Sequence, residues 1–215
     1  MDELEEFNQK VSKCQKCDLA ESRMNVVPGE GNPNAEIMFI GEGPGFHEDQ
    51  QGRPFVGAAG KFLEELLVSI DLKREDVFIA NIIKCRPPNN RDPLPQEVEA
   101  CLPWLKEQIE IIKPRLIVTL GRHSMDQFLP NLKITDVHAQ PKRYKGQVYL
   151  PMYHPAAGLY RGNMRPVIED DFKKIPQVLK KTDQLKEEDS SEASDKAKNN
   201  KVSELSNKDE QIGMF

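Results

Sequence analysis

Residues 36–70 read EIMFIGEGPGFHEDQQGRPFVGAAGKFLEELLVSI, and this stretch decides the fold. It begins with a short apolar run that is typical of a buried strand. It ends with apolar residues at helical spacing, which are typical of an amphipathic helix. Between the two, residues 41–60 hold six glycines and two prolines. A strand, a loop and a helix in this order predict one unit of a parallel α/β fold.

The same alternation continues along the chain. Three more apolar runs, at residues 77–82, 116–121 and 147–151, have the composition of buried strands. Residues 95–113 predict a long helix, in which Pro103 marks a kink or a new first turn. We expect a parallel sheet covered by helices on both faces. Ligands of such sheets lie at the carboxyl ends of the strands, so the polar segments 41–45, 121–124 and 153–157 and Asn81 are expected to converge there.

The glycines of the loop do not form a known phosphate site. Residues 41–60 lack the lysine and hydroxyl residue that end a P-loop, and they do not match G-x-G-x-x-G. The loop is therefore expected to have a role other than holding phosphate. Glu48 or Asp49 could hold the loop in place, and the alternative is that both carboxylates are simply solvated.

Length and composition predict one domain with a charged appendage. The chain of 215 residues has a net charge of -5, no apolar run long enough to cross a bilayer, and an acidic N-terminus without a signal sequence. We therefore expect a cytoplasmic protein. After Lys181 there are nine acidic residues, five lysines and few large apolar side chains. A folded domain over residues 1–181 and a disordered tail over 182–215 follow from this composition.

The end of the tail regains apolar character. Residues 211–215, QIGMF, place spaced apolar and aromatic residues after a glutamine. We expect a docking peptide that binds a sliding clamp or a single-stranded-DNA-binding protein. The alternative is a terminus without function.

The four cysteines form two pairs. Cys14 and Cys17 form a C-x-x-C motif, whereas Cys85 follows the second predicted strand and Cys101 lies in the long helix. Four thiolates can hold a zinc ion or an iron–sulfur cluster, and the pattern alone does not separate the two. The alternative is a set of incidental thiols. A structural role is favoured over a redox role, because no other feature indicates electron transfer.

Seven features in order resemble the family 4 uracil-DNA glycosylases, the iron–sulfur enzymes of thermophilic bacteria and archaea. They span about residues 5–180 and are C-x-x-C, GEGPG, GRPFVGAAG, NIIKCRPPNNRDP, the position of Cys101, LGR and YHPAA. The resemblance implies an α/β/α sandwich with a four-stranded parallel sheet. It implies a structural [4Fe-4S] cluster held by the four cysteines. It also implies a monomeric base-excision-repair enzyme, associated with the nucleoid, that releases uracil from single- or double-stranded DNA.

The resemblance also assigns roles within the pocket. Asn81 reads the uracil edge, Phe55 stacks on the flipped base, and His154 donates a hydrogen bond to uracil O2. Glu42 positions water or stabilises charge on the sugar, and Gly43 lets the backbone approach the base. Taken without the resemblance, each has a plainer interpretation: a strand-end amide, a core phenylalanine, a surface histidine, an exposed acid and a flexible glycine.

DNA contacts are expected outside the pocket. The family uses the segment after the histidine motif to enter the duplex, which implies roles for Leu159, Tyr160 and Arg161. Candidate phosphate or loop-shaping residues are Arg53, Lys84, Arg86, Arg91 and Arg122. Between Cys85 and Cys101 there is no histidine, so no stable covalent adduct with DNA is expected.

Two other classes of function remain open at this stage. The chain could be a DNA-binding module without catalysis, built around zinc or iron and sulfur. It could also be a small electron carrier. Asn81 and His154 at two strand ends favour the enzyme, because a binding module needs neither.

Overall fold

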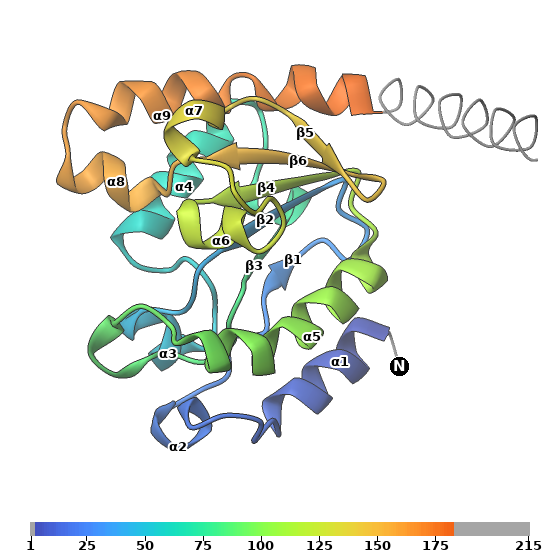
Figure 1. Cartoon of the computed structure of the whole chain (residues 1–215), viewed down its shortest axis with the longest axis vertical. Coiled ribbons are helices and arrows are strands. Elements are labelled where there is room, and N and C mark those ends of the chain that lie inside the picture. The colour runs from blue at the N-terminus through green and yellow to red at the C-terminus, as the bar shows by residue number, and fades with distance from the viewer. Residues whose placement is uncertain (1–2, 183–215) are drawn as a thin grey trace, which may run out of the picture.

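The central strands of the sheet are those predicted by the apolar runs. The computed structural model describes residues 3–182, and within them six strands form one sheet in the order β1-β3-β2-β4-β6-β5 (Figure 1). The strands are β1 (Glu30–Gly31), β2 (Ile37–Gly41), β3 (Phe78–Asn81), β4 (Leu116–Leu120), β5 (Lys142–Tyr144) and β6 (Gln147–Met152). The pairs β3–β2, β2–β4 and β4–β6 are parallel, which confirms the four-stranded parallel core. The antiparallel edge strands β1 and β5 are additions to the expected sheet.

Helices precede and follow the strands as the alternating pattern predicts. They are α1 (Glu3–Ser12), α2 (Leu19–Ser22), α3 (Phe46–Gln51), α4 (Ala58–Val68), α5 (Pro95–Ile112), α6 (Arg122–Asp126), α7 (Ile134–Val137), α8 (Pro155–Tyr160) and α9 (Met164–Phe172). Two 3-10 turns, η1 (Arg74–Asp76) and η2 (Pro88–Asn90), and a helical stretch over residues 175–182 complete the described chain. None of the described helices is long and apolar enough to cross a membrane.

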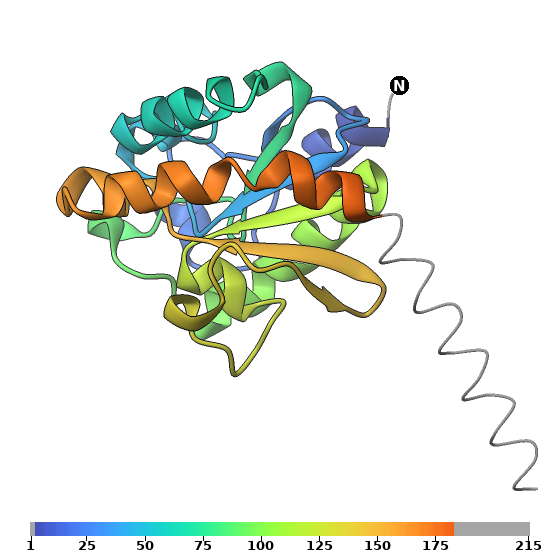
Figure 2. The same ribbon diagram turned by 90° about the horizontal axis from the view of Figure 1, so that it is seen from above.

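Side chains alternate between two cores along the central strands. Ile37 and Phe39 of β2 belong to one buried cluster with residues of α4 and α9, whereas Met38 and Ile40 belong to a second cluster with residues of α5. Figure 2 shows α4 and α9 on one side of the sheet and α5 on the other. Because successive strand residues point to opposite faces, a strand buried on both faces reads as a continuous apolar run.

The long helix α5 has clear start and stop signals. Pro95 occupies the first turn, where its missing N–H costs nothing, and the Glu97 carboxylate accepts a hydrogen bond from Leu94 N at 2.7 Å. The helix ends at Ile112, and its C-cap residue Lys113 has a left-handed φ of 51°. Pro103 lies inside the continuous helix. The prediction of one long helix is therefore confirmed.

The glycine-rich loop is more ordered than its composition indicates. Helix α3 occupies its centre, between Gly45 and a left-handed Gly52. Asp49 is buried on this helix and accepts hydrogen bonds from the N–H groups of Met24 and Asn25 at 2.9 and 3.2 Å. The loop is thereby fixed to the segment that follows α2. The predicted tail and its docking peptide, residues 182–215, lie outside the described residues except for Thr182.

Candidate active site

A cavity of about 360 Å³ opens at the carboxyl ends of the parallel strands, where ligands of such sheets are expected. It draws residues from the loops after β2, β3 and β6. All five predicted pocket residues contribute to its lining: Glu42, Gly43, Phe55, Asn81 and His154. The segment after β4 does not line this cavity itself, but it contacts Glu42 through His123.

Asn81 ends β3 with its side chain buried. Its Oδ1 atom has no hydrogen-bond partner among the described residues, although the residue is only 2% exposed. A buried amide oxygen without a partner is costly, so a ligand donor is expected there. Gly41 on the neighbouring strand makes room for it, because a Cβ at Gly41 would collide with both Asn81 Oδ1 and the ring of Phe55.

His154 is held as a neutral ring with a defined tautomer. It caps α8, and its Nδ1 accepts a hydrogen bond from Ala156 N at 3.2 Å. The proton of the neutral ring is therefore on Nε2, which is left as a donor. Burial lowers the pKa of His154 to about 4, and the negative charge of Glu48 opposes that change only in part. The ring is thus a neutral hydrogen-bond donor at neutral pH.

Phe55 packs beside His154 in an unusual backbone conformation. The two ring centroids are 5.6 Å apart with an angle of 27° between the planes. Phe55 is 6% exposed, so it belongs to the core and to the pocket wall at once. Its φ of 53° is left-handed, and a Cβ at Gly60 would collide with the carbonyl group of Phe55. Gly60 therefore permits the tight turn that presents the ring.

Glu42 lies at the mouth of the cavity with two titratable neighbours. His123 Nε2 is 3.9 Å from Glu42 Oε2 and 3.4 Å from Asp92 Oδ2. Burial raises the pKa of Glu42; positive charge on His123 lowers it and the negative charge of Asp92 raises it. The charges of His123 and Asp92 therefore influence the protonation of Glu42 in addition to its burial.

The four cysteines gather in a second place. Cys14, Cys17, Cys85 and Cys101 line one small cavity that shares no lining residue with the first. Three N–H groups point at their sulfur atoms: Trp104 Nε1 to Cys14 at 3.2 Å, Arg23 to Cys85 at 3.3 Å, and Lys84 N to Cys101 at 3.3 Å. Burial raises the pKa of the Cys101 thiol to about 11, so thiolates need a compensating metal charge here.

Comparison with known proteins decides the family. The model of the Uracil DNA glycosylase superfamily matches residues 28–180. The type-4 uracil-DNA glycosylase of Saccharolobus solfataricus is 51% identical over 189 residues, which is 83% of this chain and 88% of that protein. Those of Sulfurisphaera tokodaii and Archaeoglobus fulgidus are 50% and 49% identical, over 83% and 84% of this chain and 86% and 96% of theirs. The chain belongs to the type-4 uracil-DNA glycosylases.

The segment predicted to contact DNA is exposed on this glycosylase. Leu159 and Tyr160, at the end of α8, are 40% and 87% exposed, and Arg161 follows them at the surface. Three arginines predicted as phosphate or loop-shaping contacts lie instead beside carboxylates: Arg53 with Glu30, Arg91 with Glu97, and Arg122 with Asp126. Arg86 donates to Asn90 Oδ1. These contacts favour loop shaping over phosphate binding.

For Lys84, predicted as a phosphate or loop-shaping residue, the structure excludes the phosphate contact and favours loop shaping. Its side chain is 1% exposed and donates to Asn81 O at 3.0 Å and to Gln108 Oε1 at 2.7 Å. Burial lowers the pKa of Lys84 to about 8. The segment from Asn81 to Cys85 is also fixed by the backbone, since Ile82 N and Ile83 N donate to the loop after β2 and Lys84 O accepts from Val27 N. It therefore joins the pocket to the cysteine site.

Three further residues support the glycosylase site, and sequence reasoning gave a candidate role to two of them but none to His123. His123 belongs to the segment after β4 that was expected at this edge, but its contact with Glu42 depends on the fold. Glu48 was one of two candidates for holding the loop, and its Oε1 accepts from Val56 N and Gly57 N, both at 2.9 Å. Asp49, the next residue of α3, ties the same loop to the backbone of Met24 and Asn25.

Proposed function

We propose that the protein removes uracil from DNA by hydrolysing its N-glycosidic bond, which leaves free uracil and an abasic site for base-excision repair. The observation that carries this proposal is one pocket that holds the unpartnered Oδ1 of Asn81 and the Nε2–H donor of His154. An acceptor and a neutral donor on one cavity match N3–H and O2, the neighbouring groups on the uracil ring. Membership of the type-4 family supports the same substrate.

Asn81 would select uracil by its hydrogen-bonding edge. Its Oδ1 would accept from uracil N3–H, and its amide N–H would donate to O4. Cytosine presents an acceptor at N3 and a donor at N4, so both contacts would be mispaired in a buried site. Mispaired buried groups cost far more than they would in water, which makes this discrimination strong.

The base must leave the helix stack before these contacts can form. Leu159, Tyr160 and Arg161 are proposed to enter the duplex and hold it open, which their exposure supports. Phe55 would then stack on the flipped ring, a contact worth about 1–3 kcal/mol. Gly43 contributes no side chain to the cavity that it lines.

Departure of the base places negative charge on the uracil ring. The Nε2–H of His154 would stabilise charge at O2, and a fixed donor of this kind is a large catalytic contribution. Because the ring is neutral, it donates a hydrogen bond without transferring a proton. Glu42, in its ionised form, would orient the attacking water or stabilise the positive sugar. Ordinary turnover without a covalent adduct is expected.

The cysteine site fits an iron–sulfur cluster better than a single zinc ion. Within residues 3–182, the candidate metal ligands whose atoms all lie within 4.8 Å of one another form one group of three, Glu42, Asp92 and His123. No three cysteine sulfur atoms of these residues lie that close together. Zinc–sulfur bonds of about 2.3 Å would bring all four sulfurs within about 4 Å. We propose that the four cysteines hold a [4Fe-4S] cluster, whose contribution is structural.

The tail and the oligomeric state complete the proposal. We propose a catalytic domain over residues 1–181 that acts as a monomer on the chromosome. Residues 182–215 would be a tether whose peptide at 211–215 docks to a sliding clamp or a single-stranded-DNA-binding protein. Pull-down with the full chain and with a chain lacking residues 210–215 tests the tether. Equal recovery of both partners would end that idea.

The activity is tested with one oligonucleotide that contains a single uracil and a matched one with cytosine. We expect strand breaks after alkali only with uracil. The variant Asn81→Asp should weaken excision or alter the choice of base, and His154→Ala should reduce the rate by about 100- to 1000-fold. If the uracil oligonucleotide remains unbroken after incubation with cluster-loaded wild-type protein and treatment with alkali, the proposal is refuted.

A further inference from the structure

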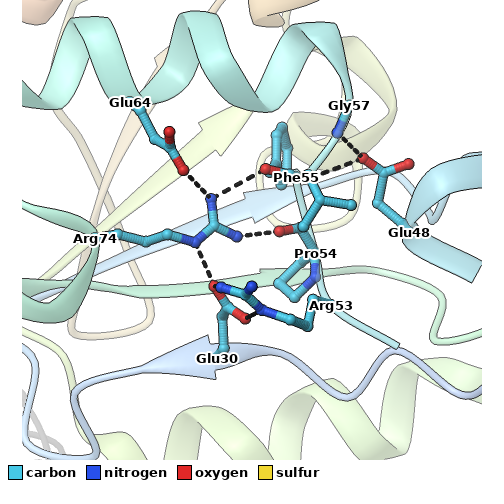
Figure 3. Close-up of polar contacts among 9 residues, drawn as sticks. Glu30, Glu48, Arg53, Pro54, Phe55, Gly57, Glu64 and Arg74 are labelled. Carbon is cyan, nitrogen blue, oxygen red and sulfur yellow. Dashed lines mark hydrogen bonds and ion pairs between the residues drawn. The ribbon is translucent and has the colours of Figure 1, made fainter. Parts of the chain in front are cut away.

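Arg74 belongs to no predicted motif and does not line the pocket, yet it binds the wall of the pocket from behind. It lies on η1, between α4 and β3, and its side chain is 15% exposed. Its guanidinium donates through NH1 to Phe55 O at 3.0 Å and through NH2 to Pro54 O, while Nε donates to Glu30 Oε1 (Figure 3). Glu64 lies 3.5 Å from NH1. The donors of Arg74 are therefore occupied by two backbone carbonyls and two carboxylates.

The segment that Arg74 binds needs to be held. Phe55 has a φ of 53°, a left-handed conformation that is strained for a residue with a side chain. Such a conformation persists only where the surroundings enforce it. Without Arg74, the carbonyls of Pro54 and Phe55 would lose their charged donor, and the backbone could rotate toward an ordinary conformation. The direction of the Phe55 ring would change with it.

A second charged side chain holds the same turn from the opposite side. Glu48 accepts the N–H groups of Val56 and Gly57, the two residues that follow Phe55 (Figure 3). Four successive residues, 54–57, thus have one backbone group each bound by either Arg74 or Glu48. Opposite charges suit the two tasks, because a guanidinium supplies paired donors for carbonyls and a carboxylate accepts from amides.

Glu30 keeps Arg74 in place. It receives both Arg74 and Arg53, and it stands on β1, the short edge strand beside β3. Burial raises the pKa of Glu30, but the hydrogen bonds from Arg53 and Arg74 outweigh that effect and lower it below its ordinary value. Glu30 therefore stays ionised at neutral pH. The two-residue strand β1 thus places this carboxylate beside Arg74.

We propose that Arg74 is a positioning residue for uracil binding, which acts by fixing the left-handed turn that presents the Phe55 ring to the flipped base. The inference rests on the proposed function, because it requires Phe55 to stack on uracil. A phosphate-binding role does not fit, since the guanidinium is mostly buried and already bonded. A plain surface ion pair does not fit either, since two of its bonds go to the backbone of the pocket wall.

The experiment compares Arg74→Met with Arg53→Met in the full-length, cluster-loaded protein. Arg53 shares the Glu30 carboxylate, is 57% exposed, and donates to Glu30 and not to the backbone of residues 54–57, so it is the matched control. Inhibition by free uracil measures the base contact without DNA. We expect the inhibition constant to rise about tenfold in Arg74→Met, as lost stacking predicts, and to stay within about twofold in Arg53→Met. KM for the uracil oligonucleotide should rise more than kcat falls, because stacking binds substrate and transition state alike.

The double variant with Phe55→Ala separates positioning from general destabilisation. If Arg74 acts through the ring, adding Arg74→Met to Phe55→Ala should change uracil inhibition by less than about twofold. Effects that multiply would overturn the inference. If Arg74→Met does not fold, Arg74→Lys replaces it. This variant keeps the charge near Glu30 but lacks the paired donors of the guanidinium, so a partial loss of inhibition by uracil is expected. Inhibition equal to that of the wild type would overturn the inference. Wild-type protein that releases no uracil refutes the proposed function instead.

Discussion

The charge state of His154 gives the sharpest test of how the pocket stabilises the departing base. Burial lowers the pKa of His154 to about 4, whereas an ordinary histidine has a pKa of 6.5. The gap of about 2.5 corresponds to about 3 kcal/mol in favour of the neutral ring, and at pH 7 about one ring in a thousand carries a charge. A mechanism that needs the imidazolium as an acid would therefore lose rate about tenfold for each pH unit above 4. A neutral Nε2–H donor predicts no such loss.

The assay is the single-turnover rate of uracil release between pH 5.5 and 9. Wild-type protein and His154→Gln are compared, because glutamine can donate a hydrogen bond but does not titrate. We expect the two profiles to run parallel above pH 6.5, with His154→Gln slower throughout. A tenfold decline per pH unit in the wild type that His154→Gln lacks would refute the neutral-donor mechanism. Nitrogen NMR of the imidazole provides an independent check, since Nδ1 should be unprotonated over the whole range.

Three further predictions concern other parts of the pocket. Activity that needs ionised Glu42 is lost as the pH falls through the raised pKa of Glu42. In pH–rate profiles, His123→Ala should move this loss of activity to higher pH, and Asp92→Asn should move it to lower pH. Shifts in the same direction would contradict the influence of these two charges on Glu42. Gly41→Ala should reduce excision by at least about 100-fold while the cluster absorbance persists, because the new methyl group collides with the side chain that reads the base; near-normal turnover would exclude this packing. Tyr160→Ala should slow excision from double-stranded more than from single-stranded DNA, by about tenfold in relative rate, because only the duplex must be opened; an equal effect on both substrates would argue against wedge insertion.

The central fold was predictable because its signals are local. Strands buried on both faces read as apolar runs, and α5 carries its own start and stop signals at Pro95 and Lys113. The edge strands β1 and β5 were missed because two or three residues cannot show a period of two. Helix α3 was missed for a different reason. Its residues FHEDQQ lack an apolar stripe, and its place is set by Asp49 binding a distant segment.

The pocket residues could be named from motifs, but their supports could not. Asn81 and His154 meet in one cavity as expected from the strand ends, and Phe55, which only the family motif indicated, lines the same cavity. Arg74 remained hidden because its two backbone contacts lie about twenty residues away in the sequence. For Lys84 the sequence left phosphate contact and loop shaping open for a related reason. A basic residue next to a polar loop resembles a phosphate contact, and only the fold, which brings Lys84 to Gln108 of α5, reveals that it is buried.

The segment from Asn81 to Cys85 has a consequence for how this protein can change over time. Its first residue faces the pocket, its last faces the cysteine cavity, and the residues between are bonded to neighbouring chain on both sides. Adding or deleting one residue here would shift Asn81 relative to Cys85 and break the backbone hydrogen bonds that hold the segment, so it would disturb both cavities together. The length of the segment is therefore constrained from both ends. A change of length that suited the pocket would also have to suit the cysteine cavity.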